Sequence, residues 1–452
     1  MAGRYKAYPE YKDSDEEWLS TMPIHWEWSK VSWSFRAEKG KNGQLLTKEY
    51  CGRKKGEFPV YSGQTENGGV MGTIDTYEFD SGVTGVLFST TVGAKAMHLT
   101  HLKGKFSLSQ NCMIIMPMVS LDVRYCFYHF QPLFAHERSL IPDHMQASFR
   151  MEDLYQYKII LPPVPEQKQI AKFLDHETGK IDALIEKQQA LIALLKEKRL
   201  AVISHAVTKG LNPHATMKDS GAEWLGDVPE HWGRSYLGFE CSVKARLGWK
   251  GLKAEEYVDE GYVFLATPNI KGEAIDFTNV DRITQERYDE SPEIMLNEGD
   301  VLVTKDGSTT GTTNVVKELP EPATVNSSIA VLRSFGQLDS LYLYYFFTSD
   351  FTQNVITRMR GGMGVPHLFQ ADLKKFDVLV PPLIEQRKIA KHVEFEASVI
   401  DVLLRKAESA IELMQERRAA LISAAVTGKI DVRDWEPAPE AQGNVKGEDD
   451  EE

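Results

Sequence analysis

The sequence predicts a mixed α/β (α+β) fold in which two globular domains are joined by two long antiparallel coiled-coil helices, a tandem duplication with pseudo-two-fold symmetry. Three observations predict it. Short phrases recur more than 200 residues apart, a coiled-coil periodicity follows the last phrase of each copy, and the intervening stretches lack that periodicity. A repeat this long is a whole domain, because the units of a solenoid span roughly 20 to 50 residues.

The framing phrases are the parts of the two copies that match. Pro-x-His-Trp begins at Pro23 and again at Pro229, an offset of 229 − 23 = 206. Pro-Pro-x-x-Glu-Gln begins at Pro162 and again at Pro381, an offset of 381 − 162 = 219. The 13 additional residues (219 − 206) lie inside the second copy, between its phrases, so the interiors have diverged.

After each Pro-Pro phrase, apolar residues recur alternately three and four positions apart, which is the spacing of a coiled-coil seam. We expect one helix from about Pro165 to Gly210 and the other from about Ile384 to Gly428, each ended by a glycine that can adopt a left-handed cap. The seam positions are Leu174, Ile181, Ile185, Ile192, Leu195 and Val202 in the first helix and, 219 residues later, Val393, Ile400, Leu404, Ile411, Met414 and Leu421 in the second.

Such an apolar stripe needs a partner surface. We predict that the two stripes face each other in an antiparallel pair, with polar interruptions at Arg199 and Arg418; the alternative is that each helix packs on its own domain. About 44 residues of helix make a rod of roughly 65 Å, which would act as a spacer between the two domains.

The interiors are rich in Gly, Thr, Tyr and Val and contain short apolar strands followed by polar turns, which indicates α/β or α+β domains. Each interior closes with an aromatic helix, which starts near Asp122 in the first copy and near Asp339 in the second. We interpret its aromatic side chains as core residues and not as a platform for stacking bases. The strands are expected within 85–93, 110–115, 299–311 and 326–331.

These boundaries give a first domain at 1–160, a first spacer helix at 161–211, a second domain at 212–379, a second spacer helix at 380–432 and an acidic disordered tail at 433–452. With 42% hydrophobic and 26% charged residues, the composition is that of a soluble protein, and no apolar run is long enough to span a membrane. The four cysteines show neither paired spacing nor a Cys-x-x-Cys motif, which favours a reducing cytoplasm.

Motifs of common catalysts are missing. Gly307 and Gly311 lack the spacing and the lysine of a phosphate-binding loop, and His98 and His101 lack the frame of a metal site. No Ser-His-Asp or Cys-His arrangement is evident either. We therefore expect no catalytic residue, no metal site and no cofactor in this chain.

The interiors contain polar, partly cationic loops that could bind DNA. Arg and Lys can contact phosphates or guanine edges, and Asn and Gln can pair with adenine, although a single charge cluster is usually only a solvated face. The candidate DNA-binding residues are Arg53, Lys54, Lys55, Gln64, Thr65, Asn67 and Lys95 in the first domain and Lys244, Arg246, Lys250, Asn269, Lys271, Lys305, Ser308, Arg358, Arg360 and His367 in the second. The net charge of −13 means that any nucleic-acid surface must be local.

The repeated Pro-x-His-Trp and Pro-Pro-x-x-Glu-Gln phrases, the long helices and their Ala-Val-Thr ends resemble the specificity subunit of Type I restriction–modification enzymes. The resemblance implies two target-recognition domains that each read one half of a split double-stranded DNA sequence. It also implies two modification (adenine-N6 methyltransferase) subunits docked on the spacer helices and two restriction (motor-nuclease) subunits outside them, in a prokaryotic cytoplasm.

By the same resemblance, S-adenosylmethionine, ATP and Mg²⁺ belong to the partner subunits and not to this chain. Two other functions stay open from the sequence: a coiled-coil scaffold whose duplicated domains bind proteins and not DNA, and a nuclease or methylase whose site is unrecognised.

Overall fold

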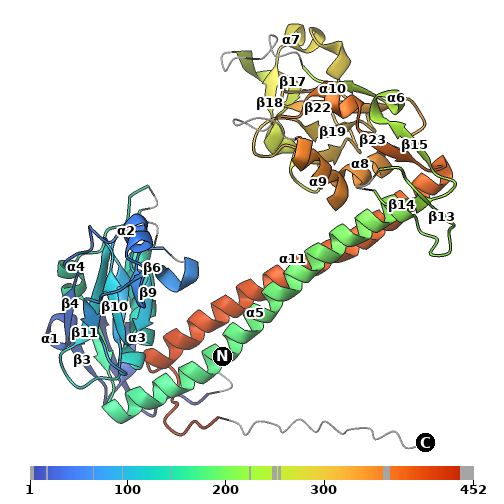
Figure 1. Cartoon of the computed structure of the whole chain (residues 1–452). Helices are drawn as coiled ribbons and strands as arrows, with labels where there is room; N and C mark the ends of the chain where they lie inside the picture. The colour runs from blue at the N-terminus through green and yellow to red at the C-terminus, as the bar shows by residue number, and fades with distance from the viewer. Residues whose placement is uncertain are drawn as a thin grey trace, which may run out of the picture. The chain divides into compact units, whose positions relative to one another are not determined.

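A computed structural model of the chain describes residues 5–16, 19–64, 66–93, 95–142, 144–222, 225–246, 252, 256–359 and 367–437. The fold has two compact units: residues 1–188 with 409–452, and residues 189–408. Each unit therefore combines one globular domain with part of both long helices (Figure 1). The borders between compact units fall inside the helices and not at the ends of the predicted domains.

The first unit contains two four-stranded sheets. One is antiparallel and has the order β4-β11-β8-β9, and the other has the order β6-β5-β10-β7 with a parallel β5–β10 pair. Their strands are β4 (Phe35–Glu38), β5 (Phe58–Tyr61), β6 (Val70–Ile74), β7 (Phe79–Asp80), β8 (Val86–Thr90), β9 (Leu99–Leu102), β10 (Lys105–Leu108) and β11 (Cys112–Pro117). Two small sheets pair β1 (Tyr11–Glu16) with β2 (Leu19–Pro23) and β3 (Glu27–Lys30) with β12 (Lys158–Leu161). The helices are α1 (Val31–Ser34), α2 (Lys48–Arg53), η1 (Glu66–Gly69), α3 (Val123–Ser139) and α4 (Met151–Gln156).

The second unit repeats this topology, except that its described residues give no counterpart of β7. Its antiparallel sheet has the order β16-β22-β19-β20, and its other sheet has the order β18-β17-β21 with a parallel β17–β21 pair. The strands are β13 (Met217–Asp219), β14 (Asp227–Pro229), β15 (Gly233–Tyr236), β16 (Cys241–Lys244), β17 (Tyr257–Leu265), β18 (Asp281–Ile283), β19 (Val301–Thr304), β20 (Thr313–Val315), β21 (Ala323–Val325), β22 (Ile329–Ser334) and β23 (Asp377–Val380). The helices are α6 (Leu237–Glu240), η4 (Thr267–Ile270), α7 (Gln285–Asp289), η5 (Pro292–Ile294), α8 (Ser340–Thr348), α9 (Asp350–Met359) and α10 (Gln370–Lys374). The shared strand order confirms the predicted duplication.

The aromatic helices α3 and α8 are core elements, as predicted. Tyr125 and Tyr342 are fully buried, and each donates its hydroxyl to a backbone carbonyl, that of Ile160 at 2.9 Å and that of Leu379 at 3.3 Å. Because burying a hydroxyl without a partner is costly, these two bonds explain how a tyrosine can occupy the same interior position in both units.

The framing phrases form the joint between each domain and its long helix. In the first unit, Glu166 accepts from the indole nitrogen of Trp26 at 2.9 Å and lies 2.9 Å from Nε2 of His25. In the second, the Glu385 carboxylate lies 2.7 Å from Nε2 of His231 and accepts from Trp232 at 3.1 Å. The two phrases match between copies because they bind each other.

The glutamine of each Pro-Pro-x-x-Glu-Gln phrase fixes the start of the aromatic helix. The side-chain oxygen of Gln167 accepts from the backbone N–H of Asp122 at 2.9 Å, and Gln386 does the same for Asp339 at 2.7 Å. Both aspartates cap their helices, α3 and α8, by accepting from N–H groups in the first turn.

The long helices α5 (Val164–Lys209) and α11 (Leu383–Val426) begin and end within two residues of the predicted bounds. Gly210 and Gly428 follow them with φ of 74° and 73°, in the left-handed region expected of a glycine cap. Every predicted seam position is buried or half-buried.

In each unit the two helices run antiparallel. In the first unit, Arg418 donates to Asp182 at 2.8 Å, and Gln169, earlier in α5, donates to the backbone of Val432 at 3.2 Å, beyond the end of α11. In the second unit, Arg199 donates to Asp401 at 3.0 Å. The two ion pairs are related by the duplication, since 182 + 219 = 401 and 199 + 219 = 418. The helix pair is thereby confirmed, although Leu174 and Val393 at the seam ends also join the domain cores.

The start of the predicted disordered tail was wrong. Trp435 packs edge-on against Phe173, with ring centroids 5.1 Å apart, and its carbonyl accepts from Gln169 at 2.6 Å. Residues 433–437 therefore belong to the first unit, and the remainder of the predicted tail, 438–452, lies outside the described residues. Within the described part of the chain, no helix has the length and apolar character needed to cross a membrane.

Candidate nucleic-acid interface

In each unit, two loops at one end of the antiparallel four-stranded sheet are joined by the same backbone contacts. In the first unit, Val92 bridges to Ser148, and the N–H of Phe149 donates to Thr91 at 2.7 Å. In the second, Asp306 bridges to His367, and the N–H of Leu368 donates to Lys305 at 2.8 Å. We call these the strand-end loops: residues 91–98 with 144–149, and residues 305–311 with 367–369. They share a backbone arrangement and differ in side chains.

In the second unit, the strand-end loops contain three predicted residues, Lys305, Ser308 and His367, and bring Lys305 and His367 together at Asp306. The ammonium of Lys305 lies 2.6 Å from one carboxylate oxygen of Asp306, and the other oxygen contacts Nδ1 of His367. The ring of Phe369 meets the imidazole edge-on, with centroids 4.3 Å apart, and its side chain is 57% exposed. Sequence reasoning missed Asp306 and Phe369. Their position beside predicted polar residues was the only signal.

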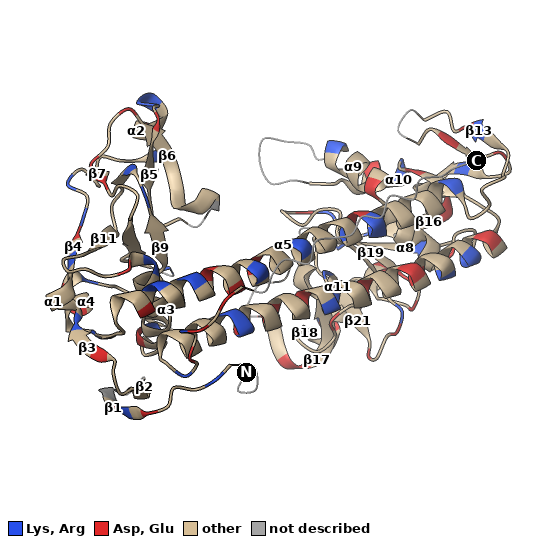
Figure 2. Cartoon of the chain, turned by 90° about the horizontal axis from the view of Figure 1, so that it is seen from below, with Lys and Arg blue, Asp and Glu red and all other residues tan. Residues whose placement is uncertain are grey.

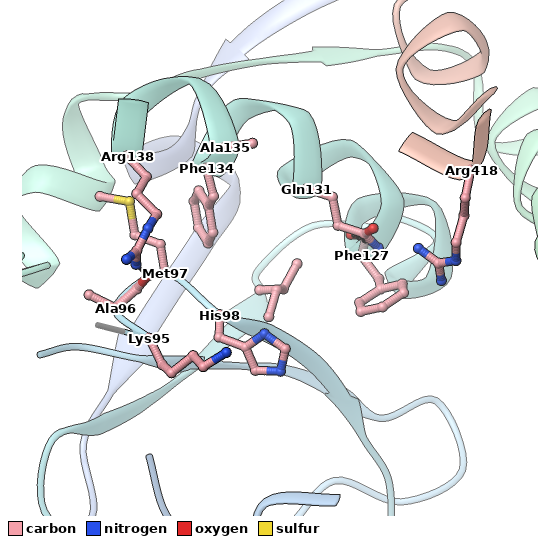
Figure 3. A pocket seen from close by; sticks show the side chains of 11 residues that line it. Lys95, Ala96, Met97, His98, Phe127, Gln131, Phe134, Ala135, Arg138 and Arg418 are labelled. Carbon is pink, nitrogen blue, oxygen red and sulfur yellow. Dashed lines mark hydrogen bonds between the residues drawn. The ribbon is translucent and has the colours of Figure 1, made fainter. Parts of the chain in front are cut away.

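In the first unit, a cavity of about 660 Å³ lies beside the strand-end loops, between the segment that carries Lys95 and helix α3 (Figure 3). Arg138 donates to the carbonyl of Ala96 at 2.7 Å, which ties α3 to that segment. Burial, and then the neighbouring Lys95, lower the pKa of His98, so its imidazole is neutral at neutral pH. The polar lining side chains are Lys95, His98, Gln131, Arg138 and Arg418.

Among the described residues, no carboxylate lines this cavity, and its three cationic side chains suit an anion such as a phosphate. Lys95 was a predicted DNA-binding residue. Arg418 was predicted only as a polar interruption of the seam, but its guanidinium both binds Asp182 and reaches the cavity wall.

The remaining candidates of the first unit belong to other segments than the strand-end loops. Arg53, Lys54 and Lys55 are exposed at the end of α2, where Figure 2 shows a basic tip. Gln64 and Asn67 donate to the carbonyl of Val70, at 2.7 and 3.5 Å, and so stabilise their own turn. Thr65 lies outside the described residues.

Two candidates of the second unit are buried, so their assignment to a DNA surface was wrong. Arg246 is 3% exposed, packs over the ring of Phe264 at 5.6 Å and donates to Ser291 at 3.4 Å. Burial lowers the pKa of its guanidinium. Asn269 is 8% exposed and uses its amide to bind the backbone of Ala266 and Asn279, both at 2.8 Å.

Three other candidates of the second unit remain on the surface. Lys244 is exposed at the end of β16, Lys271 follows η4, and Arg358 stands near the end of α9. Lys250 and Arg360 lie outside the described residues. Within the described ranges, no group of three or more His, Cys, Asp or Glu side chains is arranged to hold a metal ion.

The duplicated fold, with antiparallel helix segments in each unit, belongs to the class expected from the sequence. The pattern of the family described as Type I restriction modification DNA specificity domain matches residues 27–194 and 248–395. The chain therefore belongs to this family. Both matched stretches are therefore specificity domains of the Type I restriction–modification kind.

Individual relatives are distant. The chain is 24% identical over 281 residues to the Type I restriction enzyme MjaVIII specificity subunit of Methanocaldococcus jannaschii, which covers 61% of this chain and 63% of the relative. It is 22% identical over 316 residues to the EcoBI specificity subunit of Escherichia coli, covering 67% and 65%. The chain thus matches slightly less than two thirds of the length of these relatives.

A solved structure supports the fold. It comes from a study of complex assembly and conformational transition of the type I restriction–modification system, and it superposes with a TM-score of 0.63 at 16% identity, covering 90% of this chain and 99% of that chain.

Proposed function

We propose that this chain reads a bipartite DNA sequence for a Type I restriction–modification complex, with one half-site for each globular domain. The observation that carries the proposal is the pair of strand-end loops. The backbone bridge is the same in both units, whereas its side chains are Val92 and Ser148 in one and Asp306 and His367 in the other. A common scaffold with different side chains is what reading two different half-sites requires, because each base pair presents its own pattern of donors and acceptors.

Cationic side chains beside these loops supply the second requirement, a grip on phosphates. Lys95, Arg138 and Arg418 gather at the cavity of the first unit. Contacts to phosphates position the protein without specifying sequence. They are local, which is consistent with a chain of net charge −13. Partner subunits would supply the remaining attraction to DNA.

Exposed leucines on the long helices support docking of two copies of one partner. Leu184 and Leu403 are both exposed and lie 219 residues apart, and so do Leu194 and Leu413. Each unit presents one leucine from each helix, at positions related by the duplication. Two copies of one partner need two equivalent surfaces. We assign these surfaces to two modification (methyltransferase) subunits, with two restriction subunits joining outside them in a prokaryotic cytoplasm.

S-adenosylmethionine, ATP and Mg²⁺ would be bound by those partners. The polar side chains at the strand-end loops of this chain include hydrogen-bond donors, hydrogen-bond acceptors and the cation of Lys95. Their role would be to bind and orient DNA so that the partner reaches its target adenine.

Selection from a pool of random DNA duplexes tests the proposal. The purified full-length chain should enrich duplexes that carry two defined half-sites separated by an undefined gap of constant length. Its affinity should fall steeply as salt rises, because bound phosphates release counterions. A protein-binding scaffold would enrich no motif, and that result would refute the proposed function.

A further inference from the structure

We infer that His367, oriented by Asp306, is a specificity-determining residue for the half-site read by the second domain. The inference rests on the proposed function and adds one residue-level contact to it: a hydrogen bond from the outer imidazole nitrogen to one base edge.

His367 lies in the strand-end loops, the part of the second domain that we propose reads DNA bases. Its backbone forms an isolated β-bridge with Asp306, and Asp306 is two residues beyond the end of β19. The His367 side chain is 35% exposed, so it reaches solvent while its backbone is fixed. The side chain of Phe369 is also exposed, so an apolar ring lies next to the imidazole on the same surface.

The orientation of the imidazole is set from two sides. Asp306 binds Nδ1 with one carboxylate oxygen, while its other oxygen is held 2.6 Å from the ammonium of Lys305. Lys305 is itself nearly buried, with 11% of its side chain exposed, so the carboxylate cannot turn easily. Phe369 meets the ring at an interplanar angle of 73°. With Nδ1 occupied, a hydrogen bond to DNA must come from Nε2.

A side chain that is already oriented loses little conformational entropy on binding. A single ring nitrogen with a fixed direction can bond to one base edge in the major groove, and an exposed phenyl ring beside it can contact the methyl group of a neighbouring thymine. His367 and Phe369 together would therefore read one or two adjacent base pairs.

The first unit shows why the contact belongs to one half-site only. At the same backbone bridge it carries Val92 and Ser148, both exposed, and neither offers an imidazole or a carboxylate. The same scaffold position thus presents a different chemical group in each domain. This is the pattern expected of a specificity position and not of a structural one, because a structural role would favour equivalent side chains.

The experiment compares base preferences at every position of the selected motif for the wild-type chain, His367→Ala, Asp306→Asn and the matched control Ser148→Ala. We expect His367→Ala to lose about tenfold in preference at one base pair of one half-site, in line with the usual cost of a mismatched contact. Asp306→Asn should weaken the same position, because it replaces the charged acceptor that orients the ring with a neutral amide. Ser148→Ala should leave that half-site unchanged.

The variant His367→Gln distinguishes a loss of base recognition from a loss of protein stability. Its amide can still bond to a base, so this variant should retain affinity and prefer a different base, most simply adenine, at the same position. If His367→Ala melts below the wild-type chain, His367→Gln alone decides the question.

The inference is overturned if both His367 variants keep every base preference of the wild-type chain, or if they weaken both half-sites equally. If the wild-type chain itself selects no motif, the failure is that of the proposed function and not of His367.

Discussion

At the scale of single residues, His129 shows how one buried side chain can make the two units respond differently to pH. It is fully buried on α3, and its Nε2 accepts from the backbone N–H of Ile160 at 3.2 Å. Burial lowers its pKa to about 4, against a smaller opposite effect from the backbone of Val426. The equivalent position in the second unit, 217 residues later, is the buried Phe346.

We therefore predict that acid destabilises the first unit through His129. The unfolded chain binds a proton near pH 6.5 and the folded one only near pH 4, so stability is lost as pH falls through that window and is fully present above it. The full loss would be roughly 3 kcal/mol, at about 1.4 kcal/mol for each unit of pKa difference.

Urea unfolding at pH 7.5 and pH 5 measures this effect. His129→Phe, which copies the second unit, should remove most of the pH dependence attributed to the first unit, although it also leaves the Ile160 N–H without its partner. An unchanged pH dependence in that variant would assign the acid sensitivity to other groups.

A second prediction at this scale concerns Lys95, which is exposed at the mouth of the cationic cavity. If it contacts a phosphate, Lys95→Ala should weaken binding to all duplexes about equally. It should also reduce the slope of log affinity against log salt by about 1. Lys429→Ala, which removes an exposed lysine beyond the end of α11, is the control. A changed base preference in Lys95→Ala would instead make Lys95 a reader.

At the scale of elements, the ion pairs between α5 and α11 set the register of each helix pair. Asp182 with Arg418 and Asp401 with Arg199 occupy equivalent positions in the two units. Asp182→Arg should destabilise the first unit, because it places two cations together, and the double variant Asp182→Arg/Arg418→Asp should recover part of the loss.

For partly exposed charges the coupling recovered in the double variant should be about 1 kcal/mol or less. A double-mutant cycle measures this coupling: the thermal unfolding of Asp182→Arg, Arg418→Asp and the double variant is compared with that of the wild-type chain. The same exchange at Asp401 and Arg199 is the matched test in the second unit. No recovery in either unit would show that these pairs do not determine the register.

Local patterns allowed the two long helices, the two aromatic helices and one strand in each of four short ranges to be predicted. The seam, the aromatic helices and the framing phrases depend on side chains close in sequence, so periodicity and repetition were sufficient to locate them. The partners of Arg199 and Arg418 could not be predicted, since Asp401 and Asp182 come into reach only when the register of the antiparallel pair is known.

The candidate interface was harder to predict because loop burial depends on tertiary packing. Arg246 and Asn269 have the polar character of readers but lie inside the second unit. Asp306 and His367 are 61 residues apart and meet through one backbone bridge, which sequence spacing does not reveal. Polar composition indicated loops that belong to the candidate interface, but it could not separate their exposed side chains from their structural ones.

At the scale of the whole molecule, two constraints act on the two copies. The joints formed by Glu166 and Glu385, and the ion pairs of the helices, are kept in both copies because each is a structural contact. The strand-end loops keep their backbone and vary their side chains. This division between a constant frame and variable loops leads to the central claim that the two domains read different half-sites independently.

Exchange of one interior tests that claim most directly. Residues 233–379 lie between the Pro-x-His-Trp phrase and the second Pro-Pro phrase, so they can be replaced by the corresponding interior of another family member while both joints are retained. The chimera is co-expressed with its modification subunits, and the methylated sequences of the host genome are mapped. We expect one half of the methylated motif to change to that of the donor and the other half to stay as in the wild-type chain. An active chimera in which both halves change, or neither does, would contradict the claim.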